Sequence, residues 1–198
     1  MRRTFLLPLI AAAAAAAALA AAPAGAQSVD QGAYIDLNLT GFSGDPGALP
    51  SAINAIEGLS GGKVVEIRFN NVGGVPGYDV VVSKGSQISF QRFAKPSDGL
   101  ITLTDKTEPA WMLKWRARED VSLVRTAKVP LADAVRTAEA QRGDAPAVAA
   151  GMAKSATGAN TDVKAYNVAI VKDGVQHRVA IDSATGEVIA NPRMLAAW

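Results

Sequence analysis

The chain has 198 residues, of which 49% are hydrophobic, so it can bury a core although it contains no cysteine to form disulfides. This composition excludes a disordered or collagen-like chain, and a single histidine without cysteine excludes the ordinary zinc and copper sites. The 20 basic and 18 acidic side chains nearly balance, which gives no electrostatic reason to expect binding to nucleic acid or to an anionic membrane.

Residues 1–26 have the features of a cleaved secretory signal. Two arginines precede an alanine-rich apolar stretch, and the small side chains of Ala24 and Ala26 are those that signal peptidase accepts before its cut. We expect cleavage between Ala26 and Gln27. Because both arginines leave with the signal, the mature chain would carry equal numbers of basic and acidic side chains.

Three other interpretations of this segment are weaker. The arginine pair resembles a twin-arginine signal, but the preceding Ser or Thr is missing and no cofactor explains folding before export, so the Sec route is favoured. A retained membrane anchor is disfavoured by Pro8, Pro23 and the weak hydrophobicity of alanine. A lipoprotein would need a cysteine to acylate. The sequence therefore predicts a periplasmic or secreted bacterial protein with no stable membrane anchor after cleavage.

A strand and a short helix are the first elements predicted for the mature chain. Residues 33–40 alternate apolar with mostly polar side chains, which is typical of a strand. Asp45 can start a helix by accepting a free backbone N–H, and Gly58 can end it. Between them, apolar residues at i, i+3, i+4 and i+7 form one stripe: Leu49, Ala52, Ile53 and Ile56.

Three strands are predicted next, over residues 63–70, 78–83 and 87–93, because each segment alternates its faces. Three glycines mark the first turn, and Lys84-Gly85 marks a tight second hairpin. The glycines of the first turn are Gly73, Gly74 and Gly77. A helix followed by such a meander favours an α+β fold with one solvated sheet face.

Two segments leave alternatives open. Residues 107–128 hold a tryptophan cluster that fits either a helical turn after Pro109 or an alternating strand. Residues 145–155 occupy the place of a strand, but they are rich in alanine and glycine, so they could also be irregular or helical.

The later part of the chain repeats the order of the earlier part. Leu131, Ala134, Val135 and Ala138 have the spacing of the first helix, and Glu139 lies 82 positions after Glu57. The hairpin 166–174 parallels 78–85, with one residue added at the turn. A strand over 176–181, a turn over 182–186 and a final strand over 187–190 complete the second copy.

These elements predict an α+β fold of two tandem units, each a short amphipathic helix packed on an antiparallel β-meander. The first unit spans residues 27–106 and the second spans residues 129–198. Residues 107–128 form a tryptophan-containing connector between them, and residues 1–26 are the signal peptide.

The second copy resembles a PepSY domain. The resemblance lies in the helix 131–139, in the run Tyr166-Asn167-Val168-Ala169-Ile170, and above all in the ending 179–189, which reads VAIDSATGEVI. The first copy is similar over residues 52–82, but Ser89-Phe90-Gln91-Arg92 replaces the family's tail and lacks its Asp and Thr-Gly.

The resemblance implies a non-catalytic exported module that binds, and inhibits or regulates, an envelope or secreted peptidase in trans. PepSY domains occur in propeptides of thermolysin-type metalloproteases, but this chain has no His-Glu-x-x-His motif and only one histidine. Its target would therefore be another molecule. The alternative is a structural or ligand-sensing periplasmic interaction protein with no peptidase target.

Residues 58–62, Gly-Leu-Ser-Gly-Gly, match the nucleophile elbow of serine hydrolases only formally. That elbow needs a strand before the serine and a helix after it, whereas here the order is reversed, so these glycines indicate a helix end and a turn. His177 is in phase with apolar neighbours and is expected to be partly buried and hydrogen-bonded. We expect no catalytic residues, no metal and no cofactor.

The candidate partner contacts lie in the connector and in the final strands of the two units. An exposed strand edge can take up an extended polypeptide by backbone hydrogen bonding. The aromatic and arginine residues of the connector fit an interface, but packing between the units is favoured because a buried tryptophan contributes a large apolar area. Trp198 is either a docking anchor or a lid on the core. The candidates are Trp111, Trp115, Arg116, Ile88, Phe90 and Val188.

Overall fold

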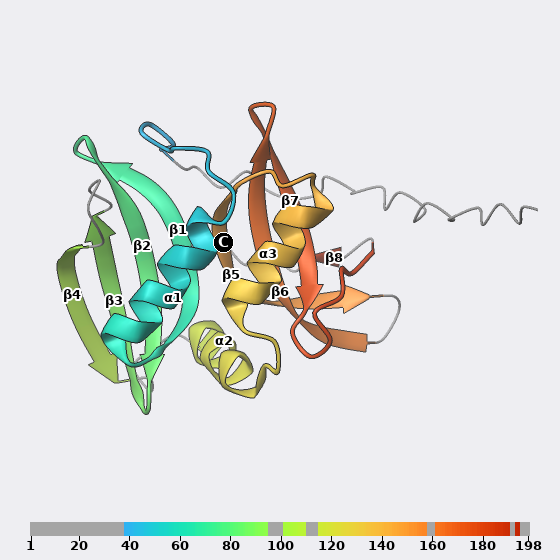
Figure 1. Ribbon diagram of the computed structural model, residues 1–198. Helices are drawn as coiled ribbons and strands as arrows, with labels where there is room; N and C mark the ends of the chain where they lie inside the picture. Colours follow the sequence, from blue (N-terminus) through green and yellow to red (C-terminus); the bar gives the residue numbers. More distant parts are fainter. Residues whose placement is uncertain (1–37, 95–100, 110–114, 158–160, 191–192, 195–198) are drawn as a thin grey trace, which may run out of the picture.

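The computed structural model describes residues 38–94, 101–109, 115–157, 161–190 and 193–194 (Figure 1). The predicted signal peptide and its cleavage site lie outside these residues, as do Trp111 and Trp198. Of the predicted strand 33–40, only residues 38–40 are described, and they form no strand. In the part of the chain that the structure describes, no helix is long and apolar enough to cross a bilayer.

The fold is α+β, as predicted, and is built on one antiparallel sheet with the strand order β4-β3-β2-β1-β5-β6-β7. The short strand β8 pairs with β5 beside this path. The elements are α1 (Ala48–Ser60), β1 (Lys63–Val72), β2 (Val75–Lys84), β3 (Gln87–Ala94), β4 (Ile101–Pro109), α2 (Trp115–Thr126), α3 (Leu131–Gln141), β5 (Ala147–Thr157), β6 (Thr161–Lys172), β7 (Val175–Asp182) and β8 (Arg193–Met194).

Helix α1 buries the predicted apolar stripe but has different ends from those expected. Its N-cap is Gly47, with no side-chain cap, so Asp45 does not start the helix. Gly58 does not end it either, because the helix runs on to Gly61, whose φ of 64° closes it in the left-handed conformation. The stripe residues Leu49, Ala52, Ile53 and Ile56 are all buried.

Strands β1, β2 and β3 confirm the predicted meander. Gly73 and Gly74 form the first turn with positive φ, as expected. Gly77 was wrongly assigned to that turn, since it lies inside β2. A Cβ atom at this position would stand 2.3 Å from the carbonyl oxygen of Phe93, so glycine is required here by the close approach of β3 rather than by a turn.

The predicted connector begins with the end of a strand and ends in a helix, while residues 110–114, most of the tryptophan cluster, lie outside the described residues. Strand β4 extends to Pro109, so the predicted boundary between residues 106 and 107 falls inside a strand. Helix α2 follows, and Arg125 near its end donates hydrogen bonds to Ser83 Oγ and to the carbonyl oxygen of Gly85. Because β4 pairs with β3, the predicted free edge at residues 88–93 is wrong.

The alanine-rich segment 145–155 forms most of strand β5. This strand is paired with β1 on one side and with β6 on the other, and the residues between Ala147 and Met152 are buried. Small side chains suit a strand that lies deep between two neighbours and under a helix, so the tertiary position overrides the poor strand propensity of alanine. The predicted final strand over 187–190 is reduced to one bridge between Ile181 and Val188.

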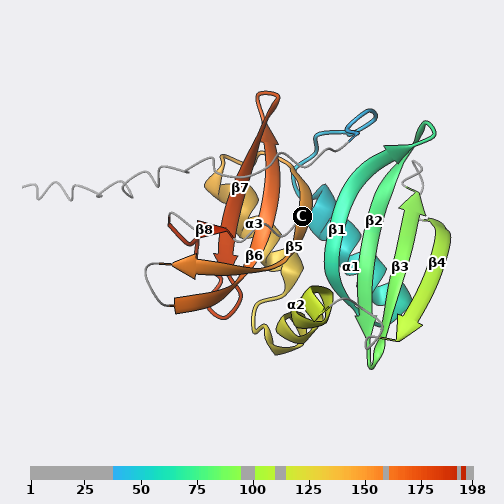
Figure 2. The same ribbon diagram turned by 180° about the vertical axis from the view of Figure 1, so that it is seen from behind.

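The pairing of β1 with β5 joins two halves of the molecule into one sheet. We call α1 with β1–β4 the first half, and α3 with β5–β7 the second half. Helices α1 and α3 pack side by side on the same face of the sheet, and Figures 1 and 2 show this from both sides. One core cluster runs through both halves, from Leu49 to Ile181.

Two glutamates tie the helices to the strands that follow them. Glu57 Oε1 accepts the backbone N–H of Val64 at 3.0 Å, and Glu139 Oε1 accepts that of Ala147 at 2.9 Å. Glu139 Oε2 also accepts the N–H of Gly47, at 3.0 Å, and thereby links the second half to the start of α1. Burial raises the pKa of Glu139 above its usual value, although the two N–H donors oppose this shift.

Candidate functional site

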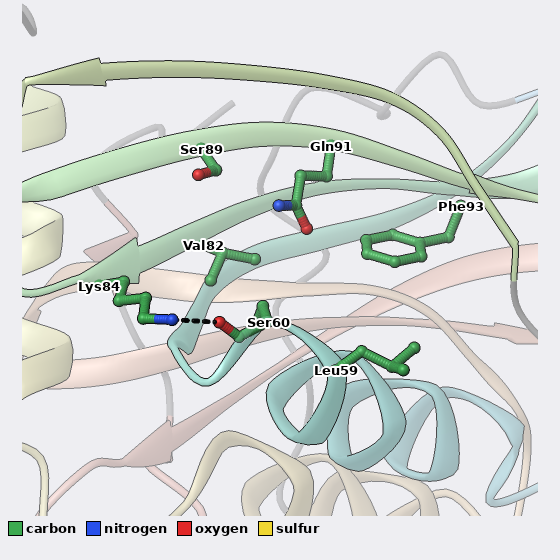
Figure 3. A pocket seen from close by; sticks show the side chains of 7 residues that line it. All are labelled: Leu59, Ser60, Val82, Lys84, Ser89, Gln91 and Phe93. Atoms are coloured by element: carbon green, nitrogen blue, oxygen red, sulfur yellow. Dashed lines mark hydrogen bonds between the residues drawn. The ribbon is translucent and has the colours of Figure 1, made fainter.

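The best candidate site is a pocket of about 340 Å³ between the end of α1 and the strands β2 and β3 (Figure 3). It lies on the face of the sheet that carries the helices. Its lining comes from the last residues of α1 and from β2 and β3. The lining residues are Leu59 and Ser60 of α1, Val82 and Lys84 of β2, and Ser89, Gln91 and Phe93 of β3.

The pocket exists because the two helices lie differently on their strands. Helix α3 packs across β5, β6 and β7, whereas α1 packs chiefly on β1, β5 and the neighbouring α3. In Figure 1 the last turn of α1 reaches in front of the lower part of β2 and β3, and among the described residues no helix packs along the rest of the helix-side face of β3. The sheet continues outward through β4, so this uncovered face lies beside the outer strand of the first half.

Register shows what fills the same place in the second half. Gln91 of β3 stands opposite Val80 of β2, and Val179 of β7 stands opposite Val168 of β6. Val179 is buried in the core, whereas Gln91 is half-buried and lines the pocket. A polar residue thus occupies in the first half the position that an apolar residue fills in the second.

Two polar groups converge on the pocket. Lys84 Nζ donates a hydrogen bond to the carbonyl oxygen of Ser60, at 3.0 Å, which places the ammonium at the end of α1. This position is favourable because a helix C-terminus carries partial negative charge. Gln91 Oε1 is buried and accepts no hydrogen bond from the described residues. Buried polar atoms are nearly always hydrogen-bonded, so this oxygen is available to accept a hydrogen bond from a ligand.

The rest of the lining is apolar. Leu59 is 67% exposed, the highest value among the exposed large hydrophobic residues of the described chain. It lies on the same side of the pocket as Phe93, and Val82 lies on the other side, between Lys84 and Gln91 (Figure 3). Phe93 and Val82 are themselves buried. The site therefore combines an apolar wall with an ammonium group and an unpaired amide oxygen.

Ser60 and His177 are not brought together. Ser60 Oγ donates to the carbonyl oxygen of Ile56, at 2.7 Å, as a helix-terminal serine often does, and it accepts the N–H of Gly62. His177 is half-buried on β7, at the opposite end of the sheet from β3. The described lining of the pocket contains neither a histidine nor a carboxylate. Among the described residues, no three His, Asp or Glu side chains gather as a metal site would require.

The predicted partner contacts are scattered. Ile88 is fully buried, and Val188 is half-buried against the core. Phe90 is 38% exposed, but it lies on the face of the sheet away from the pocket, beside the ion pair of Arg92 and Asp79. Trp115 and Arg116 begin α2, and their side chains are outside the described part of the structure.

The residues that form the pocket were not predicted to lie together. Ser89, Gln91 and Phe93 alternate along one strand, and a polar pair in phase with a buried aromatic residue is a signal of an incompletely covered face. Leu59 and Lys84 carried no such signal, because their roles depend on where α1 ends relative to β2.

No protein-family model matches the sequence, and no curated protein matches it. Among solved structures, the chain is similar to a putative lipoprotein from Clostridium difficile 630, with 19% sequence identity. The similarity covers 71% of this chain and 89% of that chain, with a TM-score of 0.41. A likeness of this size carries no argument about fold or function.

Proposed function

We propose that the protein is an exported, non-catalytic module that binds an extended segment of another polypeptide along the β3–β4 margin of its sheet. The target class that the PepSY resemblance implies is a secreted or envelope peptidase, which the module would inhibit or regulate in trans. On this proposal the signal peptide directs the chain to the periplasm or outside the cell.

The observation that carries the proposal is that β4 has one paired side and one unpaired side among the described residues. It is hydrogen-bonded to β3 along its inner side, and among the described residues no strand pairs with its outer side. Such an edge presents a row of backbone donors and acceptors to an incoming chain. The uncovered face beside α1 then offers side-chain contacts next to this edge.

Corresponding contacts in the two halves support the proposal of two tandem PepSY-like units. Tyr78 and Tyr166 are both fully buried, and each lies on the second strand after a helix: Tyr78 on β2 and Tyr166 on β6. Lys84 Nζ donates to the carbonyl oxygen of Ser60, and Lys172 Nζ donates to that of Arg142, so each lysine caps the end of a helix. The glutamates Glu57 and Glu139 correspond in the same way.

The test is inhibition combined with cross-linking. The protein purified from its own cell envelope is incubated, at micromolar excess, with the peptidases secreted by the same cells. We expect slower hydrolysis and, with a photo-cross-linking residue at Asp105 on β4, covalent capture of the peptidase. The same residue at Asp173, in the β6–β7 turn, is the control and should capture less. Unchanged rates at micromolar excess reject peptidase inhibition. Capture of a different envelope protein at Asp105 would support the structural alternative instead.

A further inference from the structure

We propose that the pocket beside α1 is a subsite for one apolar residue of the bound polypeptide, and that it holds that residue's peptide group as well as its side chain. This inference rests on the proposed function, because it names what the β3–β4 margin selects. The pocket gives the module sequence preference, which pairing to a strand edge alone does not provide.

The apolar wall identifies the side chain. Leu59 is 67% exposed on the last turn of α1, where it contributes little to the core. Together with Phe93 it leaves a gap that a branched or aromatic side chain would fill and would remove from water. The volume of about 340 Å³ is at the lower end of the range of ligand pockets, which suits one residue better than a larger ligand.

The two polar groups identify the peptide group. Gln91 Oε1 needs a donor, and the Lys84 ammonium can donate three hydrogen bonds, of which Ser60 receives one. A peptide unit offers an N–H donor and a carbonyl acceptor. The peptide unit that follows the bound residue offers both groups side by side. An ester in its place would keep the carbonyl for Lys84 but would leave Gln91 Oε1 without this donor. The pocket therefore favours an amide-linked residue over an ester-linked one.

The distance to the sheet edge is compatible with one continuous ligand. Adjacent strands are about 4.8 Å apart, so a segment paired with β4 would run about 10 Å from β3. About three residues of extended chain span this distance. The residue in the pocket would thus follow the paired stretch closely.

The first measurement uses small probes on the full exported chain. N-acetyl-leucine N-methylamide carries the apolar side chain and both peptide groups, and N-acetyl-leucine methyl ester replaces the second N–H with an oxygen atom without adding charge. We expect the first probe to shift the amide NMR signals of residues 82–93 and to bind about fivefold more tightly than the ester, the difference of one hydrogen bond. Equal binding, or shifts elsewhere in the molecule, would overturn the inference.

The second measurement uses fluorescent, end-capped nonapeptides of threonine and serine with one central leucine or alanine. We expect the leucine peptide to bind at least about tenfold more tightly. Leu59→Ser should remove most of this preference, whereas Val175→Ser, at another exposed apolar residue outside the pocket, should preserve it. Gln91→Met should weaken binding of the leucine peptide about fivefold.

Lys84→Met has a matched control in Lys172→Met, because each variant loses one hydrogen bond to a helix-terminal carbonyl. Only Lys84→Met should weaken binding of the leucine peptide. If both peptides bind equally and Leu59→Ser changes neither, the pocket inference fails while polypeptide binding stands. If the small amide binds in the pocket but neither peptide binds, the proposed function fails instead.

Discussion

Each half of the molecule begins with a helix that is followed by antiparallel strands, but the two halves use the helix-side face of the sheet differently. In the second half, α3 covers three strands and Val179 and Ile181 are buried beneath it. In the first half, α1 leaves part of the face open, and Gln91 lies where Val179 lies in the other half. The comparison teaches that one pattern of helix and meander can give either a closed core or a binding pocket, depending on where the helix rests.

The glutamates show a second difference. Glu57 binds one backbone N–H and the exposed Lys63, whereas Glu139 is 4% exposed and binds a backbone N–H in each half. The first half therefore depends on the second for its helix start, through Gly47, while no corresponding bond from Glu57 reaches α3 among the described contacts.

Unfolding at alkaline pH tests a feature that the two halves share, a buried tyrosine in each. Burial raises the pKa of Tyr78 to about 12, and burial with the nearby charge of Glu57 does the same for Tyr166. A raised folded-state pKa means stability that is complete below pH 10 and is lost as the pH rises through 12. We expect a combined loss of about 4 kcal/mol at pH 12. Urea unfolding between pH 9 and 12 measures it, and a flat profile would contradict it.

Replacing each glutamate by alanine tests how differently Glu57 and Glu139 contribute to stability. Glu139→Ala leaves two N–H groups without an acceptor and should lower the free energy of unfolding by about 3 kcal/mol. Glu57→Ala leaves one N–H, at a more exposed site, and should lower it by about 1 kcal/mol. Urea unfolding of both variants gives the two values. Equal losses would mean that Glu139 does not link the halves.

The position before each buried tyrosine distinguishes the halves again. Gly77→Ala would place a methyl group against the carbonyl oxygen of Phe93 and should cost about 2 kcal/mol, because β2 and β3 must separate. Ala165, at the corresponding position of β6, already carries that methyl group in the core. Ala165→Gly should therefore cost only about 1 kcal/mol. Thermal and urea unfolding compare them, and a neutral Gly77→Ala variant would show that the strands are not in close contact.

The end of α1 gives the smallest effects. Gly61→Ala forces a side chain into a positive φ and should cost about 1 kcal/mol. Gly58→Ala, inside the helix and facing open space, should stabilise the protein by about 0.5 kcal/mol. Opposite signs in thermal unfolding confirm that the helix ends at Gly61. A destabilised Gly58→Ala variant would instead indicate that α1 ends at Gly58, as the sequence predicted.

The sequence predicted most of the helices and strands because local spacing is enough to define them. The stripe from Leu49 to Ile56 and the alternation in β1, β2 and β3 are decided by residues within one or two turns of one another. The end of α1 was misplaced because Gly58 and Gly61 are equally plausible caps until the path to β1 is known. Strand β5 stayed open because its alanines pack well only between β1 and β6.

The candidate site could not be predicted from the sequence for a related reason. Ile88 was expected on a free edge, but β4 covers that edge from residues 101–109, and no strand was predicted over residues 101–106. Lys84 and Leu59 meet at the pocket only because α1 stops beside the end of β2. No spacing along the chain encodes that meeting.

The α+β class of the chain and most of its helices and strands follow from the sequence alone, because side-chain periodicity and turn glycines act over short distances. The pairing of β1 with β5, the place of β4 rather than β3 at the outer edge, and the position of α1 beside the pocket are set by the folded structure. Those choices depend on contacts between residues far apart in the chain, whose energies compete and cannot be ranked from local pattern.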